Sequence, residues 1–396
     1  MSKLRVGILF GGRSGEHEVS LLSAASVIAA IDKKKYEVVP IGITKEGRWV
    51  TAAHAERLLQ GKGEDVAAEA RHLRAGDPEA TTAAAVLSDG QSIVVPPVPG
   101  SALAPFQKGM PQRRREDHVI NVDVVFPVLH GTFGEDGTVQ GLLELADLAY
   151  VGAGVLGSAA GMDKDVMKRL FREAGLPIVK HVTVLRSDWE REPRKVQKRV
   201  EAALQYPVFV KPANLGSSVG ISKARASGEL PAALDEAAKF DRKIVIEQGV
   251  GGKKAKAREL ECSVLGNDSP QASAVGEVVP IREFYDYTAK YLEEGSELII
   301  PAKLTKTQTR QVQEMAVRAF QAVDCSGLGR IDFLMDPRSQ KIYVNEINTL
   351  PGFTSISMYP KLWAASGLPY PELIDRLIQL GLERHRDKAR NRYTKD

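Results

Sequence analysis

Apolar residues occur along the chain in short runs that alternate with amphipathic stretches, and this pattern predicts a mixed α/β (α+β) protein. Leu4 to Phe10 is a continuous apolar run, typical of a strand buried on both faces of a parallel sheet. A glycine-rich loop follows, then an amphipathic helix from Val19 to Ile31 and a strand from Tyr36 to Ile43. Together these form a βαβ unit, which binds ligands at the carboxyl ends of its strands.

Two polar residues stand at such strand ends. Glu18 lies at the start of the predicted helix, where it either caps the helix dipole or faces a ligand. His130 follows the apolar run from Val122 to Leu129 and precedes a glycine turn. A lone histidine is commonly structural, so both a structural and a functional role stay open for His130.

The middle of the chain alternates helices and strands around a second glycine-rich loop. Strands are expected at 179–184, 207–211 and 244–248, with helices at 164–174 and 193–204. The loop KPANLGSSVGI, which begins at Lys211, is rich in backbone N–H donors suited to covering phosphates. A plain hairpin turn is the alternative. The motif GAGVLG at 152–157 is not a dinucleotide fingerprint, because the nearest acid at the required distance, Glu173, lies inside a helix.

The strongest chemical signal is a predicted hairpin formed by Arg330 to Met335 and Lys341 to Ile347, after a long helix at 305–323. A turn near Ser339 sets Asp332 opposite Glu346, and Asn348 shares the face of Glu346 because side chains alternate along a strand. Two carboxylates and an amide are ligands that Mg²⁺ prefers. The alternative is a hairpin with acidic residues on a solvated face.

Composition limits the class of protein. The chain has 396 residues, which is long enough for two or three domains. A net charge of +4 gives no sign of nucleic-acid binding. Two cysteines without partners at ligand spacing, no signal-peptide pattern and no membrane-spanning apolar run predict a cytoplasmic protein that binds no membrane.

Six sequence runs, in order, resemble the D-alanine–D-alanine ligases of the ATP-grasp superfamily. They are GGRSGEHEVS, VLHGTFGEDGTVQG, GMDKDVMK, VFVKPANLGSSVGIS, FYDYTAKY and GRIDFLMD with VNEINTLPGFTSIS. The resemblance covers nearly the whole chain except 52–118, an elaboration in which a helix and a short hairpin are expected. It implies a three-domain ATP-grasp fold: an N-terminal parallel-sheet (preATP-grasp) domain at 1–153, a central subdomain at 154–250, and a C-terminal subdomain with the Mg²⁺ site at 251–396.

The same resemblance implies which residues bind ATP and metal. Lys164 and Lys211 correspond to the lysines that hold ATP phosphates, and Gly216, Ser217 and Ser218 lie in the phosphate-covering loop. The residues expected at the adenine are Glu247, Gln248 and Val250, with Glu261 at the ribose. The expected ligands of two Mg²⁺ ions, with Mn²⁺ as an acceptable substitute, are Asp332, Glu346 and Asn348.

Catalytic roles follow from the resemblance as well. Arg330 and the Gly352 N–H are expected to stabilise an oxyanion. The first substrate's ammonium is expected at Glu18, its carboxyl group beside His130, and the second substrate's carboxylate at Ser357. The remaining roles are a loop-closing set of Glu18, Ser217 and Tyr291, and a phosphate contact from Lys290.

The implied reaction joins two D-alanine molecules through an acyl phosphate, for peptidoglycan precursor synthesis, and a homodimer is expected. Two alternatives remain: another ATP-grasp ligase, such as a D-alanine–D-lactate ligase, and a nucleotide-binding relative without catalysis. Tyr291 in the run AKY favours the enzyme that uses an amine. The hairpin residues that a non-catalytic relative is free to lose are all present, namely Arg330, Asp332, Glu346 and Asn348.

Overall fold

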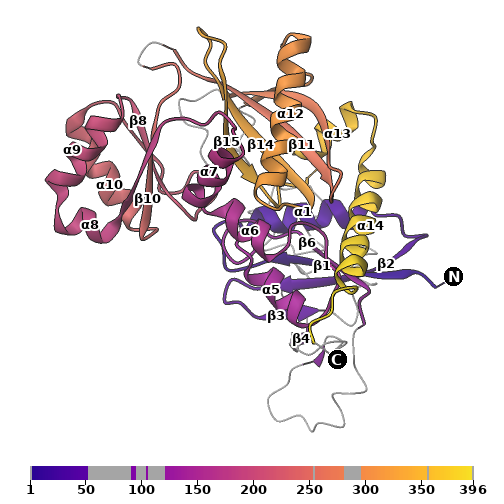
Figure 1. Cartoon of the computed structure of the whole chain (residues 1–396). Coiled ribbons are helices and arrows are strands. Elements are labelled where there is room, and N and C mark those ends of the chain that lie inside the picture. The colour runs from indigo at the N-terminus through magenta and orange to yellow at the C-terminus, as the bar shows by residue number, and fades with distance from the viewer. Residues whose placement is uncertain are drawn as a thin grey trace.

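The computed structural model of the chain describes residues 2–51, 91–94, 104–105, 121–252, 255–280, 296–354 and 356–394 (Figure 1). Strands within these ranges form three sheets, and helices pack on each. In Figure 1 the second sheet and its helices form a lobe at the left, and the third sheet lies above the first. The predicted mixed α/β class is confirmed.

The first sheet has the strand order β5-β4-β3-β2-β1-β6. Its centre is parallel, as predicted, because β1 pairs in parallel with both β2 and β6. Antiparallel pairing then extends it through β3, β4 and β5. The strands are β1 (Leu4–Gly11), β2 (Tyr36–Ile43), β3 (Trp49–Thr51), β4 (Gln91–Val94), β5 (Ala104–Pro105) and β6 (Val124–Pro127). The pair β4–β5 is the short hairpin predicted within 52–118, whereas the helix predicted there lies outside the described residues.

Helices cover both faces of this sheet because β1 is apolar on both. Ile8 and Phe10 pack in one core with α1 (His17–Ala30) and α14 (Tyr370–Lys388), while Leu9 packs in another with α5 (Thr138–Leu145). The C-terminal helix therefore contributes to the core of the N-terminal sheet, and in Figure 1 it runs down to the level of β1 and β2.

The second sheet is antiparallel, with the order β7-β10-β8-β9. Helices α8, α9 and α10 pack against it around buried Val200, Val210 and Ile246. The elements are β7 (His181–Leu185), α8 (Arg186–Arg191), α9 (Pro193–Ala203), β8 (Val208–Pro212), β9 (Ser222–Ala224), α10 (Leu230–Ala238) and β10 (Lys243–Gln248). The predicted helix and strands of this region are confirmed to within a few residues.

The third sheet is antiparallel and has the order β13-β12-β11-β14-β15. Its long helix α12 begins with a capping box, in which the Thr305 side chain and Gln308 satisfy each other's backbone N–H groups. The elements are β11 (Arg258–Gly266), β12 (Gln271–Pro280), β13 (Ser296–Ile299), α12 (Lys306–Ala322), β14 (Gly327–Met335), β15 (Ile342–Asn348) and α13 (Met358–Ala365).

Two helices link the second and third sheets. Helix α7 (Lys164–Glu173) buries Met167 and Phe171 in the core beneath the third sheet, and α6 (Val155–Met162) adds Ala160 to the same core. The first turn of α7, however, faces the second sheet. The three predicted domain ranges stay a prediction, and this packing shows that 154–176 share a core with the C-terminal part. Among the described helices, none has the length and apolar character needed to span a bilayer.

Candidate active site

The hairpin of β14 and β15 has the predicted register. Asp332 pairs with Glu346 and Arg330 with Asn348. Arg330 binds Asp332 with two parallel bonds, Nε to Oδ1 at 2.7 Å and Nη2 to Oδ2 at 2.8 Å, and the Asn348 amide donates to Asp332 Oδ2 at 3.0 Å. A forked Arg–carboxylate contact of this kind fixes both side chains in orientation. The structure therefore brings the predicted cation and the predicted metal ligands together.

The chemistry of this set fits a hard cation. Two carboxylates and an amide on one face leave further coordination positions for water and for phosphate oxygens, which is how Mg²⁺ is usually bound. Among the described residues there is no cluster of three or more His, Cys, Asp or Glu side chains suited to a metal. The predicted set contains only two such residues and an amide, so its role as a metal site stays a prediction.

Glu261 lies next to this hairpin rather than apart from it. It faces Asp332 across the β11–β14 pairing, and its Oε2 lies 3.0 Å from Arg330 Nε. Arg330 thus lies between two carboxylates, and its side chain is only 15% exposed. The ribose contact predicted for Glu261 stays a prediction.

The two predicted phosphate lysines are buried on neighbouring elements. Lys164 is the first residue of α7, and its Nζ donates to the Leu215 carbonyl at 2.7 Å. Lys211, on β8, donates to Glu247 Oε2 at 2.8 Å. The backbone N–H of Lys164 also binds the Ala213 carbonyl at 3.0 Å, so Lys164 is tied to the glycine-rich loop that Lys211 precedes on β8.

Glu247 is engaged by two lysines. Its second oxygen, Oε1, lies 3.0 Å from the ammonium of Lys168, a residue that the sequence analysis did not identify. Burial by itself raises the pKa of Glu247, but the charges of Lys168 and Lys211 outweigh it and hold that pKa well below its usual range. The adenine contacts predicted for Glu247, Gln248 and Val250 stay a prediction. The Gln248 side-chain oxygen accepts from Gln205 N at 3.0 Å.

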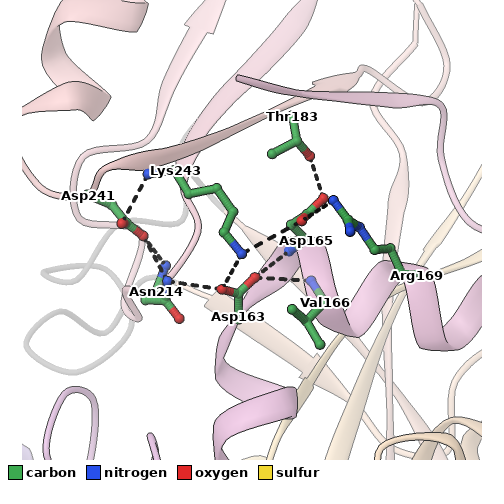
Figure 2. Close-up of polar contacts among 8 residues, drawn as sticks. All are labelled: Asp163, Asp165, Val166, Arg169, Thr183, Asn214, Asp241 and Lys243. Atoms are coloured by element: carbon green, nitrogen blue, oxygen red, sulfur yellow. Dashed lines mark hydrogen bonds and ion pairs between the residues drawn. The ribbon is translucent and has the colours of Figure 1, made fainter. Parts of the chain in front are cut away.

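A polar network fixes the start of α7 to the second sheet (Figure 2). Asp163 caps the helix by accepting from the N–H groups of Asp165 and Val166, both at 3.0 Å. The other oxygen of Asp163 accepts from Lys243 Nζ at 2.6 Å and from the Asn214 amide at 3.2 Å. Lys164 follows the cap directly, so this network sets its position.

Asn214 extends the network into the glycine-rich loop. Its backbone N–H and its side-chain amide both donate to Asp241 Oδ2, at 2.8 and 3.0 Å (Figure 2). Beyond it, Ser217 and Ser218 adopt left-handed backbone conformations with φ of 49° and 60°, which L-residues rarely adopt. Strained backbone of this kind clusters at ligand-binding loops.

Glu16, and not Glu18, meets this loop. The Ser217 hydroxyl donates to Glu16 Oε1, and Glu16 is buried. Glu18 instead contacts Lys45 and its side chain is 42% exposed. The predicted pairing of Glu18 with Ser217 is therefore wrong. Glu16 is the N-cap residue just before α1, whereas Glu18 lies in its first turn, so the two side chains face different surroundings.

His130 and Glu135 together hold the backbone of one residue, Leu350, in the segment after β15. His130 is buried, and its Nδ1 lies 3.0 Å from the Leu350 carbonyl while its Nε2 lies 3.1 Å from Ser23 Oγ. Burial lowers the pKa of His130 and favours its neutral form. Glu135 accepts from the N–H groups of Gly131 at 2.7 Å and Leu350 at 3.2 Å. Both polar groups of Leu350 are thus fixed two residues before Gly352.

Other predicted residues have simpler surroundings. Ser357 precedes α13, and its Oγ accepts from Thr354 N at 3.0 Å and lies 2.8 Å from Thr354 Oγ1. Gly352 is buried between this turn and Leu350. Lys290 and Tyr291 lie outside the described residues. Glu16, Glu135 and Lys168 were missed although each lies within a sequence run that carried the resemblance.

Comparisons with known proteins identify the family of this chain. A family model described as "D-ala D-ala ligase N-terminus" matches residues 5–153, and one described as "D-ala D-ala ligase C-terminus" matches 170–379. A D-alanine–D-alanine ligase of Bacillus cytotoxicus is 47% identical over 394 residues, covering 100% of both chains. One of Heliobacterium modesticaldum is 48% identical, covering 99% of this chain and 98% of the relative.

Solved structures of the same kind share the fold. The D-alanine-D-alanine ligase from Coxiella burnetii is 35% identical, with a TM-score of 0.78, 98% coverage of this chain and 97% of that chain. VanG D-Ala:D-Ser ligase from Enterococcus faecalis is also 35% identical with a TM-score of 0.78, covering 96% of this chain and 100% of that chain. The predicted ATP-grasp architecture is confirmed by these neighbours.

Proposed function

This chain belongs to the D-Ala–D-Ala ligase family, and from that premise we propose that it joins two D-alanine molecules to D-alanyl-D-alanine with the conversion of ATP to ADP and phosphate. The dipeptide serves peptidoglycan precursor synthesis. The observation that carries the proposal is the hairpin cluster of Arg330, Asp332 and Asn348, which faces Glu261. The chain also buries the two proposed phosphate lysines, Lys164 and Lys211.

Phosphate binding falls to residues around the glycine-rich loop. Lys164 binds the carbonyl of Leu215 in this loop, and Lys211 lies on the strand that leads into it. Two positive charges suit the charge that spreads over a phosphoryl group during transfer. Asp332, Glu346 and Asn348 would hold Mg²⁺. When bound, the metal neutralises phosphate charge and orients the transferred group.

The chain's own residues then act on the two amino acids. In the first step the carboxylate of one D-alanine attacks the γ-phosphate, and ADP leaves. In the second step the amine of the other D-alanine attacks the acyl carbon, phosphate leaves, and the amine loses a proton. Arg330 and the Gly352 N–H stabilise the oxyanion of this step, and Leu350, fixed by His130 and Glu135, holds Gly352 in place.

Glu16 takes the role expected for Glu18. It is the buried glutamate that faces the loop through Ser217, so it is the carboxylate able to bind the first substrate's ammonium. Ser357 stays the candidate for the second substrate's carboxylate. Closure of the loop over Glu16 excludes water, which protects an acyl phosphate from hydrolysis.

The identity of the second substrate has a specific competitor. VanG, a solved neighbour of this chain, is a D-Ala:D-Ser ligase with the same identity and TM-score as the D-alanine–D-alanine ligase neighbour. The curated relatives at 47% and 48% identity favour D-alanine. D-Serine and D-lactate therefore belong in the test as competing second substrates.

The deciding experiment measures phosphate release from ATP and Mg²⁺ with D-alanine alone or with D-serine, D-lactate or L-alanine added, and identifies products by mass. D-Alanine-dependent release with formation of the D,D-dipeptide is expected. Arg330→Ala should lower the rate on the order of 100-fold or more, whereas Arg310→Ala, an exposed residue of α12, should leave it near the parent value. A mixed dipeptide as main product would overturn the substrate assignment.

Assembly and location complete the proposal. We infer a homodimer and a cytoplasmic location, in which the free, buried Cys262 and Cys325 stay reduced. Light scattering coupled to size exclusion should give twice the chain mass, and a single-chain mass would contradict the dimer.

A further inference from the structure

Lys168 is a fully buried lysine beside the proposed ATP site. It lies one helical turn after Lys164 on α7, and its side chain is 1% exposed. Its ammonium contacts Glu247 Oε1 at 3.0 Å and donates to the Asn345 carbonyl at 3.0 Å. A buried charge is strongly unfavourable unless it is paired and hydrogen-bonded, so a lysine kept in this position must make those contacts.

The Asn345 contact depends on an irregularity in the hairpin. Asp332 pairs with Glu346, but the next pair joins Phe333 to Val344, so Asn345 is an extra residue on β15. A bulge of this type disrupts the ladder locally and re-aims backbone and side chains. Here the Asn345 carbonyl points to Lys168, and the residue that follows the bulge is Glu346, one of the proposed metal ligands.

The Glu247 contact sets the environment of Lys211. The carboxylate is divided between two cations: Oε1 lies on Lys168 and Oε2 on Lys211. Lys211 therefore contacts one carboxylate oxygen rather than two. With two positive charges around one negative charge, the group keeps a net positive charge next to the loop proposed to cover the phosphates.

We propose that Lys168 is a positioning residue for nucleotide binding. It acts through Glu247 to keep the Lys211 ammonium directed at the phosphates. It also ties β10, the strand that carries Glu247, to the hairpin of β14 and β15 through the Asn345 carbonyl. The inference rests on the proposed function, because it assigns phosphate binding to Lys211. The Lys168 ammonium contacts Glu247 and the Asn345 carbonyl, so it is assigned a positioning role and not a contact with substrate or metal. Its effect reaches the phosphates through Glu247 and reaches Glu346 through the bulge.

Removing the ammonium gives a defined change. In Lys168→Met the chain keeps a side chain of similar length, but Glu247 then has Lys211 as its lysine partner and draws that ammonium toward both oxygens. The phosphates lose part of their positive environment. Lys168→Gln keeps an N–H donor for the Asn345 carbonyl but has no charge. It therefore separates the contribution of the hydrogen bond to Asn345 from that of the ion pair with Glu247.

The test is the dissociation constant of ADP with Mg²⁺, measured by calorimetry on the full chain, together with the melting temperature. Lys168→Met should weaken ADP binding by about tenfold, an ordinary size for coupled groups in contact. Lys195→Met, which changes an exposed residue of α9, is the surface control. Phe171→Leu, buried on α7 without polar contacts of its side chain, is the stability control: it should lower the melting temperature but leave ADP binding within about twofold.

A double-mutant cycle with Glu247→Gln separates positioning from general destabilisation. If Lys168 acts through Glu247, the losses in ADP binding should be less than additive. Additive losses, or a folded Lys168→Met that binds ADP as tightly as Phe171→Leu does, would overturn the inference. Absence of D-alanine-dependent turnover in the parent chain would instead count against the proposed function, since ADP binding is measured without D-alanine.

Discussion

At the scale of single residues, the partners of a buried carboxylate decide its charge. Glu247 and Glu135 both lose water, which raises the pKa of either group. Two lysines reverse that effect at Glu247. At Glu135 the negative charge of Glu16 adds to it, and the pKa rises to about 8 despite two backbone N–H donors. Glu135 therefore holds a proton at neutral pH, whereas Glu247 is ionised.

This protonation makes stability depend on pH. A glutamate with a raised folded-state pKa binds a proton in the folded state that the unfolded chain has already released. Stability therefore falls as pH rises from the unfolded value near 4.5 to about 8, and levels off above that. Glu135→Gln removes this fall in stability with rising pH. It also removes one of the two oxygens that accept backbone N–H groups, so the variant should be less stable than the parent at pH 5.

The stability gap between Glu135→Gln and the parent should then narrow toward pH 8, by up to roughly 1 kcal/mol per pH unit. Thermal unfolding of both proteins from pH 5 to 8.5 measures the gap. Glu236→Gln, an exposed glutamate of α10, should follow the parent at every pH. A gap that stays constant across the window would contradict a proton on Glu135.

Glu16 and Glu18 provide a matched pair within three residues. Glu16→Gln should lower the ligation rate on the order of 100-fold, since one partner of a buried, hydrogen-bonded charge pair with the substrate's ammonium is lost. Glu18→Gln removes an exposed ion pair with Lys45 and should keep most of the activity, because such pairs contribute little. Steady-state rates with D-alanine measure both, and equal losses would restore the role predicted for Glu18.

At the scale of elements, α7 connects three parts of the site. Its N-terminal cap, Asp163, binds Lys243 on β10 and Asn214 in the loop after β8, and its first residue is Lys164 (Figure 2). One turn later Lys168 contacts Glu247 and the hairpin of β14 and β15. Met167 and Phe171 anchor the helix in the core beneath the third sheet. A shift of this helix would move Lys164, and with it Lys168, the second lysine partner of Glu247, relative to the metal residues.

Asp163→Ala should therefore affect both stability and nucleotide binding. Loss of the cap alone costs about 1 kcal/mol, and loss of the Lys243 and Asn214 contacts should raise the KM for ATP several-fold. Thr305→Ala is the matched control, since it removes the cap of α12 at a similar energetic cost, away from the site. Melting temperatures and KM values of the two variants measure this, and equal KM values would refute the positioning role of the cap.

At the scale of the whole molecule, the sequence predicted what periodicity and short-range geometry determine. The buried strand β1 was predicted from its apolar run, and the Asp332–Glu346 register from the position of a turn. Glu16 was missed because the pattern did not define where α1 begins, and so did not show that Glu16 precedes the helix as its N-cap while Glu18 lies inside it. Lys168 was missed because a lysine on an amphipathic helix is normally exposed, and only tertiary packing shows that it meets Glu247.

One link that only tertiary structure reveals joins Ser217, on the loop of the second sheet, to Glu16 at the first sheet, 201 residues apart in the chain. It is the contact by which the central lobe meets the N-terminal domain over the proposed phosphate site.

Ser217→Ala should leave the fold intact and loosen this closure. Water then reaches the acyl phosphate, so phosphate release should exceed dipeptide formation. Parallel measurement of phosphate and dipeptide gives the ratio, which should be one for the parent and for Ser227→Ala, whose hydroxyl donates to Glu201 on α9. A ratio of one in Ser217→Ala would mean that the link does not exclude water during the reaction.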